Sequence, residues 1–242
     1  MMNSTILLPD VPETVIANHL IKNNYCKLFV SNDHIIVQSD FGPEELIGFG
    51  SDANEIFQLL KQIKGWRCIV LDTNVATKLG DLLLSNTKIN VRYLTDVYHT
   101  NNQKIITNKN YEGASLLKAE NTEEIQIITK EFEINGFKTI NELLVNGFLV
   151  FSKIEDQIVS ITYTSALSQK YADIGTFTKE AFRGQGFSTA NATLVVNKVL
   201  EIGKIPIWSC GDTNSGSLKV AQKLGFKEVS RRKYVIGSPL LD

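Results

Sequence analysis

A short glycine-rich turn, RGQGFS at residues 183–188, has the composition of a phosphate-binding loop. Arg183 stands beside two glycines, Gly184 and Gly186, between a strand pattern and a helix pattern. The backbone N–H groups at the start of a helix attract anions, and an arginine adds charge-assisted hydrogen bonds. Because glycine has no Cβ atom, a phosphate can approach the backbone closely. These residue types and their spacing therefore predict a ligand that carries phosphate groups.

Two other phosphate-binding motifs do not fit this turn. The Gly-x-Gly-x-x-Gly pattern of dinucleotide-binding folds is absent, and no Gly-Lys-Ser/Thr follows as it would in a P-loop. A purely structural interpretation stays open, in which the turn only caps the helix that follows.

The segments on either side predict the elements that position the turn. Residues 170–178 have the composition of a strand that enters it, and residues 187–202 carry an apolar stripe at helical spacing. We expect Asn191 and Asn197 on the opposite, solvent-facing side of that helix. The stripe itself consists of Ala192, Val195, Val196, Val199 and Ile202.

The rest of the chain alternates between strand and helix patterns. Glu155 and Asp156 predict the turn of a hairpin over residues 148–166, and Asn32 and Asp33 predict an earlier one. The run from Arg231 to Lys233 is expected to be a solvated strand end. Further strands are expected at 66–72, 89–99, 205–211 and 227–237, and further helices at 52–65, 75–86, 122–132, 138–147 and 215–226.

Composition and charge exclude several classes of protein. The 25 basic and 26 acidic residues balance, so the overall charge suggests neither a nucleic-acid partner nor a membrane surface. The three cysteines and three histidines form no metal-binding pattern, so no metal is expected. No signal peptide and no membrane-spanning run is apparent, and a cytoplasmic location fits best.

The turn and a later block together resemble known motifs. RGQGFS resembles the Arg/Gln-x-x-Gly-x-Gly/Ala signature of the GCN5-related N-acetyltransferases (GNAT), and DTNSGSLKVAQKLGF at 212–226 resembles their Asn-(spacer)-Leu-Gly-Phe block. The resemblance covers residues 112–240. The whole chain is also similar to the branch that contains the zwittermicin A resistance acetyltransferase.

This resemblance implies a fold and a domain organisation. We expect a mixed α/β protein whose GNAT domain, residues 109–242, has a central, mostly antiparallel twisted sheet flanked by helices. A smaller α/β domain of unknown role, residues 1–108, precedes it. The boundary is placed in the polar stretch at residues 100–113, which has the composition of a linker or an exposed hairpin.

The resemblance also implies acetyl-coenzyme A as the acyl donor. Its diphosphate would bind residues 183–188, where Ser188 stands in place of the family's usual Gly or Ala and could bind a phosphate oxygen or cap the helix. Asn214 matches the position that holds the pantetheine arm, although an N-cap role is also compatible. The expected cofactor-binding residues are Phe177 and Thr178 (through backbone N–H groups that polarise the thioester), Arg183, Gly184, Gln185, Gly186, Phe187, Ser188 and Asn214.

Two further positions are candidates for proton transfer. Asp173 stands where several family members carry a glutamate, and it would deprotonate the acceptor amine, unless it is merely a solvated strand end. Many family members have a tyrosine at the position of Ala221, so thiolate protonation would fall to Ser217, to Tyr163 or to solvent. Trp208 could line the acceptor pocket, but core packing is the better expectation.

Two functions of different classes follow. The first is an N-acetyltransferase that moves an acetyl group from acetyl-coenzyme A to a primary amine of a small molecule. The second is a non-catalytic acyl-coenzyme A sensor or interaction module, which the departure at Ala221 favours. The N-terminal residues would supply part of the acceptor pocket or a homodimer contact.

Overall fold

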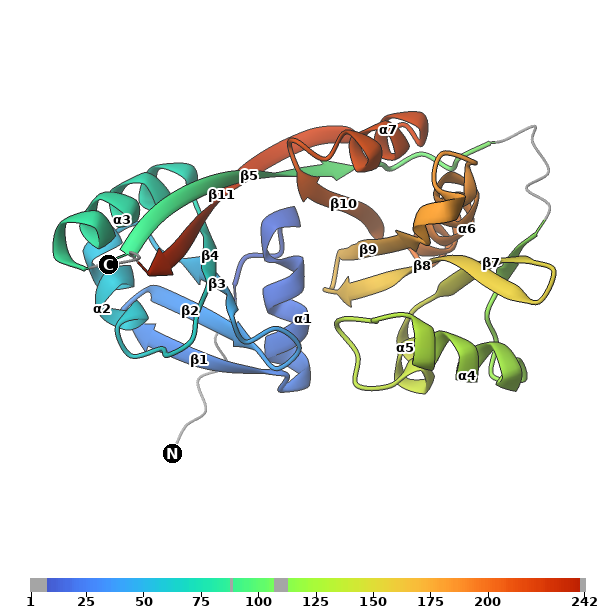
Figure 1. Ribbon diagram of the computed structural model, residues 1–242, viewed down its shortest axis with the longest axis horizontal. Coiled ribbons are helices and arrows are strands. Elements are labelled where there is room, and N and C mark those ends of the chain that lie inside the picture. Colours follow the sequence, from blue (N-terminus) through green and yellow to red (C-terminus); the bar gives the residue numbers. More distant parts are fainter. Residues whose placement is uncertain (1–7, 88, 107–112, 240–242) are drawn as a thin grey trace. The chain divides into compact units, whose positions relative to one another are not determined.

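The computed structural model describes residues 8–87, 89–106 and 113–239 (Figure 1). The chain forms two compact units, and each is discontinuous in sequence. The boundary expected between residues 108 and 109 falls within residues 107–112, which lie outside the described residues. The first unit contains the residues up to His19, Tyr98–Ser209 and Ser215–Val229, and the second contains Leu20–Val97, Cys210–Asn214 and the residues from Ser230 onward.

A mostly antiparallel sheet forms the first unit. Its strand order is β10-β9-β8-β7-β6, and only the pairing of β10 with β9 is parallel. The strands are β6 (Ala114–Leu116), β7 (Leu149–Ile154), β8 (Gln157–Leu167), β9 (Tyr171–Thr178) and β10 (Ile205–Gly211). The helices are α4 (Thr122–Glu131), α5 (Ile140–Asn146), α6 (Phe187–Glu201) and α7 (Ser215–Lys223), with short 3-10 turns η1 (Pro12–Thr14) and η2 (Glu180–Phe182). The mixed, mostly antiparallel fold class is therefore confirmed.

Local sequence explains the hairpin between β7 and β8. Glu155 lies at the turn with a φ of 52°, the left-handed conformation that a tight hairpin turn requires. The register then pairs Ile154 with Gln157 and continues to Leu149 opposite Tyr163. The expected turn at Glu155 and Asp156 is confirmed.

Helices cover both faces of this sheet. Figure 1 shows α6 on one side of β7 and β8 and α4 with α5 on the other. On the α4 and α5 side, the core contains Leu117, Ile128, Phe132, Phe137, Ile140, Leu143, Leu149, Phe151, Ile158, Ile161 and Tyr163.

The side of α6 that packs on the sheet carries a buried amide. Asn191 has no exposed surface, accepts a hydrogen bond from Ser152 Oγ at 2.7 Å and donates one to the carbonyl oxygen of Ser160 at 3.3 Å. The expectation that Asn191 faces solvent is therefore wrong. Its side chain is buried because partners more than 30 residues away satisfy its polar atoms.

The second unit contains the other strands of this sheet and has its own core. The strands β1 (Cys26–Ser31), β2 (His34–Ser39), β3 (Glu45–Phe49), β4 (Cys68–Leu71), β11 (Lys227–Pro239) and β5 (Ile89–Thr100) follow one another in this order. The helices are α1 (Val15–Asn23), α2 (Ala53–Leu60) and α3 (Thr73–Asn86), and the ends of α1, β5, β10 and β11 extend into the other unit. Asp52 and Asp72 cap α2 and α3 by accepting from Asn54 N and Asn74 N. Helix α1 and strand β3 were not expected from the sequence.

One residue of the basic run in β11 is buried. Arg232 is 5% exposed, donates to the carbonyl oxygens of Gly48 and Val70, and stacks over the Phe49 ring at 4.6 Å. The expectation of a solvated strand end is therefore wrong for this residue. An arginine can be buried here because its planar guanidinium meets carbonyl oxygens and an aromatic face at once.

Candidate functional site

The glycine-rich loop joins η2 to the first turn of α6. Gly184 and Gly186 have φ angles of 79° and 97°, the left-handed region that glycine adopts without strain. Gly186 is the N-cap of α6, which begins at Phe187. No atom of the chain lies within 4 Å of where a Cβ would stand at either glycine, and both residues are exposed. The loop therefore presents open backbone at a helix start.

Two polar side chains of this loop are tied back to the chain. The exposed Arg183 donates from Nε to the carbonyl oxygen of Thr178 at 3.2 Å, and Gln185 donates from Nε2 to the carbonyl oxygen of Ala181 at 3.4 Å. The contact of Arg183 holds its guanidinium group beside the end of β9. A positive charge is thus fixed next to the start of α6, where an anion would bind.

A chain of hydroxyl groups connects the start of α6 to the sheet. Ser160 Oγ donates to the carbonyl oxygen of Phe177 at 3.0 Å, and Thr178 Oγ1 lies 2.8 Å from Ser160 Oγ. Ser188 Oγ lies 2.7 Å from Thr178 Oγ1. Because each hydroxyl has one proton, Thr178 must donate to Ser160, and Ser188 must donate to Thr178. In this arrangement the Ser188 hydroxyl donates its proton to Thr178, and the expected phosphate contact through its side chain stays a prediction.

Strands β9 and β10 separate after a short paired segment. Across the described residues of the two strands, the last paired residues are Asp173 and Ile207, and both strands continue beyond them. We call the region beyond this pair the β9–β10 fork, formed by residues 174–178 of β9 and residues 208–209 of β10. A fork of this kind leaves backbone groups of β9 open toward the gap between the strands.

The alternation along β9 decides which backbone groups face the fork. Lys179 N donates to the Val159 carbonyl oxygen on β8, and the Phe177 carbonyl oxygen also points to β8, where Ser160 binds it. With a period of two residues, the Phe177 N–H faces β8, and the N–H groups of Thr176 and Thr178 face the fork. The expected backbone donation from Phe177 into the site is therefore wrong. The Phe177 ring is 46% exposed and contacts the Phe132 ring edge-on.

Asp173 lies at the closed end of the fork, inside the protein. It is only 5% exposed, and its two carboxylate oxygens accept hydrogen bonds from Ser165 Oγ at 2.6 Å and from Ser209 Oγ at 3.2 Å. Burial raises the pKa of Asp173 to about 6, although both hydroxyl groups act in the opposite direction. The interpretation of Asp173 as a solvated strand end is wrong. Ser165 and Ser209 were not expected from the sequence.

The loop between α4 and α5 packs beside this carboxylate. Gly136 has a φ of 92°, and a Cβ there would overlap the carbonyl oxygen of Ser165. His19 donates from Nε2 to the Gly136 carbonyl oxygen at 2.6 Å, since its Nδ1 accepts from Leu167 N at 3.3 Å. Asn135 N donates to Tyr163 Oη at 3.2 Å, and burial raises the pKa of that phenol. These contacts fix the loop over the Ser165 side of Asp173.

Ser217, the acid candidate on α7, binds a side chain of the core. Ser217 Oγ accepts the indole N–H of Trp208 at 2.9 Å, and Trp208 packs against Phe226 in the core, as expected. Ala221 is buried, with 1% of its surface exposed, and as an alanine it offers no hydroxyl group for proton transfer. Asn214 is exposed and belongs to the second unit, and its expected contact with the cofactor stays a prediction.

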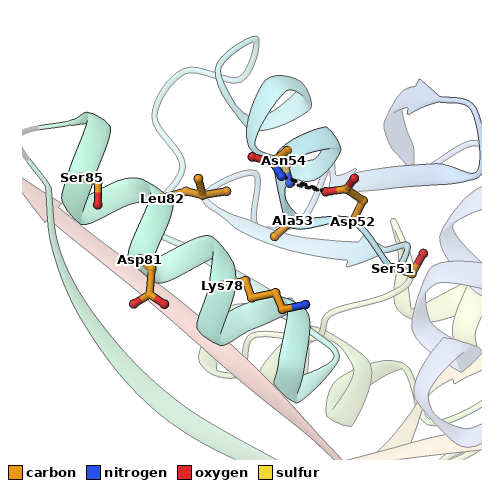
Figure 2. Close-up of a pocket in the computed structure, with 8 residues that line it drawn as sticks. All are labelled: Ser51, Asp52, Ala53, Asn54, Lys78, Asp81, Leu82 and Ser85. Carbon is orange, nitrogen blue, oxygen red and sulfur yellow. Dashed lines mark hydrogen bonds between the residues drawn. The ribbon is translucent and has the colours of Figure 1, made fainter.

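A separate cavity lies in the second unit. It has a volume of about 550 Å³ and is lined by Ser51, Asp52, Ala53, Asn54, Lys78, Asp81, Leu82 and Ser85 (Figure 2). Within this cavity the Asp52 carboxylate accepts a hydrogen bond from the backbone N–H of Asn54, in the first turn of α2. Neither the fork nor the glycine-rich loop contributes to this cavity. Over the described part of the chain, no group of residues could hold a metal ion, and no helix is long and apolar enough to span a membrane.

The glycine-rich loop thus lies at the start of α6, and β9, the strand that leads to it, separates from β10 in a fork. The family model described as GNAT acetyltransferase matches residues 53–236, and the protein belongs to this family. The match begins in the N-terminal part of the chain, which the motif resemblance left out.

Relatives of the chain carry similar names. It is 28% identical over 94 residues to the uncharacterised N-acetyltransferase YdfB of Bacillus subtilis, a match that spans 39% of this chain and 36% of that protein. A GCN5-related N-acetyltransferase-like protein from Streptococcus suis superposes with a TM-score of 0.69 at 20% identity, covering 95% of each chain. A GCN5-related N-acetyltransferase from Kribbella flavida gives a TM-score of 0.65 at 13% identity, covering 96% of this chain and 97% of that one. These two structures share the fold.

Proposed function

We propose that the protein transfers an acetyl group from acetyl-coenzyme A to a primary amine of a small molecule in the cytoplasm. The single observation that carries this proposal is the course of β9, which runs from a buried carboxylate to a glycine-rich helix start. At about 3.3 Å per strand residue, Asp173 and Thr178 are separated by roughly 17 Å. An extended cofactor arm can follow such a strand, with phosphates at one end and the thioester at the other.

The glycine-rich loop would bind the diphosphate of the cofactor. The N–H groups of residues 184–188 are the donors, and their φ angles at Gly184 and Gly186 turn the backbone toward the ligand. Arg183 adds charge from beside the loop. Ser188 contributes its backbone N–H, because its hydroxyl proton is used on Thr178.

The open side of β9 would polarise the thioester. The N–H groups that face the fork belong to Thr176 and Thr178, so these are the donors that can stabilise the oxyanion of a tetrahedral intermediate. The assignment of Asn214 to the pantetheine arm rests on its match to the family motif alone.

Asp173 would be the general base. Near neutral pH a carboxyl group with a pKa of about 6 is mostly ionised, yet it is more basic than an ordinary aspartate. It can therefore hold the proton that an acceptor ammonium group loses, whether directly or through an intermediate group. Release of the coenzyme A thiolate needs no strong acid, and the buried Ala221 offers none.

The test is a panel of small primary amines assayed for thiol release from acetyl-coenzyme A, with calorimetric titration of the cofactor alongside. We expect micromolar cofactor binding, a higher melting temperature with the cofactor and acetylation of at least one amine. No binding at about 1 mM acetyl-coenzyme A would refute the cofactor assignment.

A second function has one observation in its favour. Ala221 is buried and stands where many family members carry the hydroxyl group of a tyrosine. A non-catalytic acyl-coenzyme A sensor does not need that hydroxyl group. Cofactor binding without acetylation of any amine in a broad panel would favour this sensor over the enzyme.

A further inference from the structure

The carboxylate of Asp173 is shielded from any substrate that enters the fork. The residue is 5% exposed, whereas both of its hydroxyl partners, Ser165 and Ser209, are partly exposed. A general base must lie within hydrogen-bond reach of the proton that it removes, directly or through one intermediate group. The two serines are hydrogen-bond partners of Asp173 that could carry its proton to a substrate.

The two serines approach Asp173 from different strands. Ser165 lies at a β-bulge of β8, where the register passes from Thr164 opposite Ile174 to Ala166 opposite Asp173. Ser209 lies on β10, two residues beyond Ile207, the last residue that pairs with β9. One hydroxyl group therefore reaches Asp173 from within the sheet, and the other reaches it from the fork.

Their surroundings differ as well. The backbone of Ser165 is packed against Gly136, so the loop between α4 and α5 covers that side of the carboxylate. Its hydroxyl bond to Asp173 is also the shorter one, 2.6 Å against 3.2 Å for Ser209. Ser165 is therefore suited to hold the Asp173 carboxylate in place. Ser209 lies in the fork and makes the longer hydrogen bond, so it is suited to exchange Asp173 for a substrate group as its partner.

We infer that Ser209 relays the proton of the acceptor ammonium group to Asp173, while Ser165 holds the carboxylate in place. This inference rests on the proposed acetyl transfer. Ser209 Oγ accepts a proton from the ammonium nitrogen and passes its own proton to Asp173 Oδ1. The neutral amine then attacks the thioester carbon, its C–N bond forms, and the C–S bond breaks with the electron pair leaving on sulfur. The second proton that the nitrogen loses as the amide forms goes to this thiolate or to solvent. The proton held by Asp173 returns through Ser209 to the thiolate or to solvent.

The matched variants Ser209→Ala and Ser165→Ala separate the two roles. With the relay removed, Ser209→Ala is expected to lower kcat about 10²-fold on the plateau above the acidic limb, with the Kd of acetyl-coenzyme A unchanged. Ser165→Ala removes a hydrogen bond that stabilises the ionised carboxylate, so the pKa of Asp173 should rise. The acidic limb of the rate profile should then move to higher pH, and the turnover above that limb should be close to that of wild type. Ser209→Thr keeps a hydroxyl group and is expected to restore most of the rate.

A double variant tests whether Ser209 acts through Asp173. In the Asp173→Asn background, Ser209→Ala is expected to cause less than about a threefold further loss, because both residues serve one proton path. Melting temperatures and cofactor titrations of each variant show whether it is folded. Full turnover of a folded Ser209→Ala protein, or independent and additive losses in the double variant, would overturn the relay.

Failure of the relay can be distinguished from failure of the proposed function. If the wild-type protein acetylates an amine and Ser209→Ala does so equally well, only the relay is wrong. If the wild-type protein acetylates no amine, both are wrong. Carbon-13 NMR titration of the Asp173 carboxyl group provides a readout without turnover: Ser209→Ala and Ser165→Ala should both raise its pKa, and an unchanged pKa in Ser209→Ala would contradict the contact on which the relay depends.

Discussion

The two faces of the first unit's sheet bury polar groups in different ways. On the α6 side, hydroxyl groups and an amide form closed chains, such as Ser188 to Thr178 to Ser160 and Ser152 to Asn191. On the opposite side, one ionisable carboxylate, Asp173, accepts from two partly exposed hydroxyl groups. The first network is neutral and uses its protons internally, so it fixes the start of α6. The second holds a group whose charge can change, so it is suited to proton transfer.

The largest effect in this comparison concerns stability and follows from the charge of Asp173. Burial raises its pKa from 3.8 to about 6, so the folded protein binds this proton more tightly than the unfolded chain, and stability falls as the pH rises through that window. At pH 7 the cost is on the order of 3 kcal/mol. Asp173→Asn should therefore melt at a higher temperature than wild type at pH 7 and at nearly the same temperature at about pH 4.

Thermal melts of the two proteins across this pH range provide the measurement. Glu201, on the exposed end of α6, serves as the control, because Glu201→Gln removes a carboxylate without changing a buried charge. A difference in melting temperature between wild type and Asp173→Asn that stays the same from about pH 4 to pH 7 would contradict the burial of an ionised Asp173.

The cofactor loop should respond to the shape of the backbone at Gly186. With φ at 97°, Gly186→Val introduces strain of about 1–3 kcal/mol and places a branched side chain where the diphosphate would approach. Calorimetry should show at least about tenfold weaker acetyl-coenzyme A binding.

Gly186→Asn separates these two causes. Asparagine tolerates a positive φ, and no atom of the chain obstructs its Cβ, so its melting temperature should stay close to that of wild type. Weakened cofactor binding in a stable Gly186→Asn protein would indicate close approach by the phosphates. Binding as tight as wild type in both variants would remove the loop from the cofactor site.

The smallest effect is expected in the neutral network. Ser188→Ala breaks the hydroxyl chain at its outer end and should cost about 1 kcal/mol in the free energy of unfolding, measured by urea denaturation. Acetyl-coenzyme A affinity should change less than about threefold, because the backbone N–H of residue 188 is retained. A loss of cofactor affinity without loss of stability would show that the hydroxyl group binds phosphate after all.

The order of the strands and helices around the glycine-rich loop could be predicted, because the sequence signals for these elements are local. The two glycines of the loop and the apolar stripe of α6 are adjacent in sequence, and the strand at residues 205–211 agrees with β10 residue for residue. Short-range turn chemistry and periodicity are sufficient for such segments.

The buried polar residues could not be predicted, because their partners are distant in sequence. Asn191 and Arg232 were expected in solvent, yet Ser152 lies 39 residues from the first and Gly48 lies 184 residues from the second. The partners of Asp173 were missed for a related reason, since Ser165 reaches it only through a β-bulge. A serine that interrupts the strand alternation of residues 157–167 is the one local signal that points to this bulge.

The pH dependence of acetyl transfer in wild type and Asp173→Asn tests the central claim most directly. With a saturating amine from the panel, the wild-type rate should rise with pH and level off above about pH 6, where Asp173 is ionised. Asp173→Asn should turn over about 10²-fold more slowly and lose this limb, while its acetyl-coenzyme A Kd stays that of wild type. An Asp173→Asn protein with the wild-type rate and the same pH profile would contradict the assignment of Asp173 as the base.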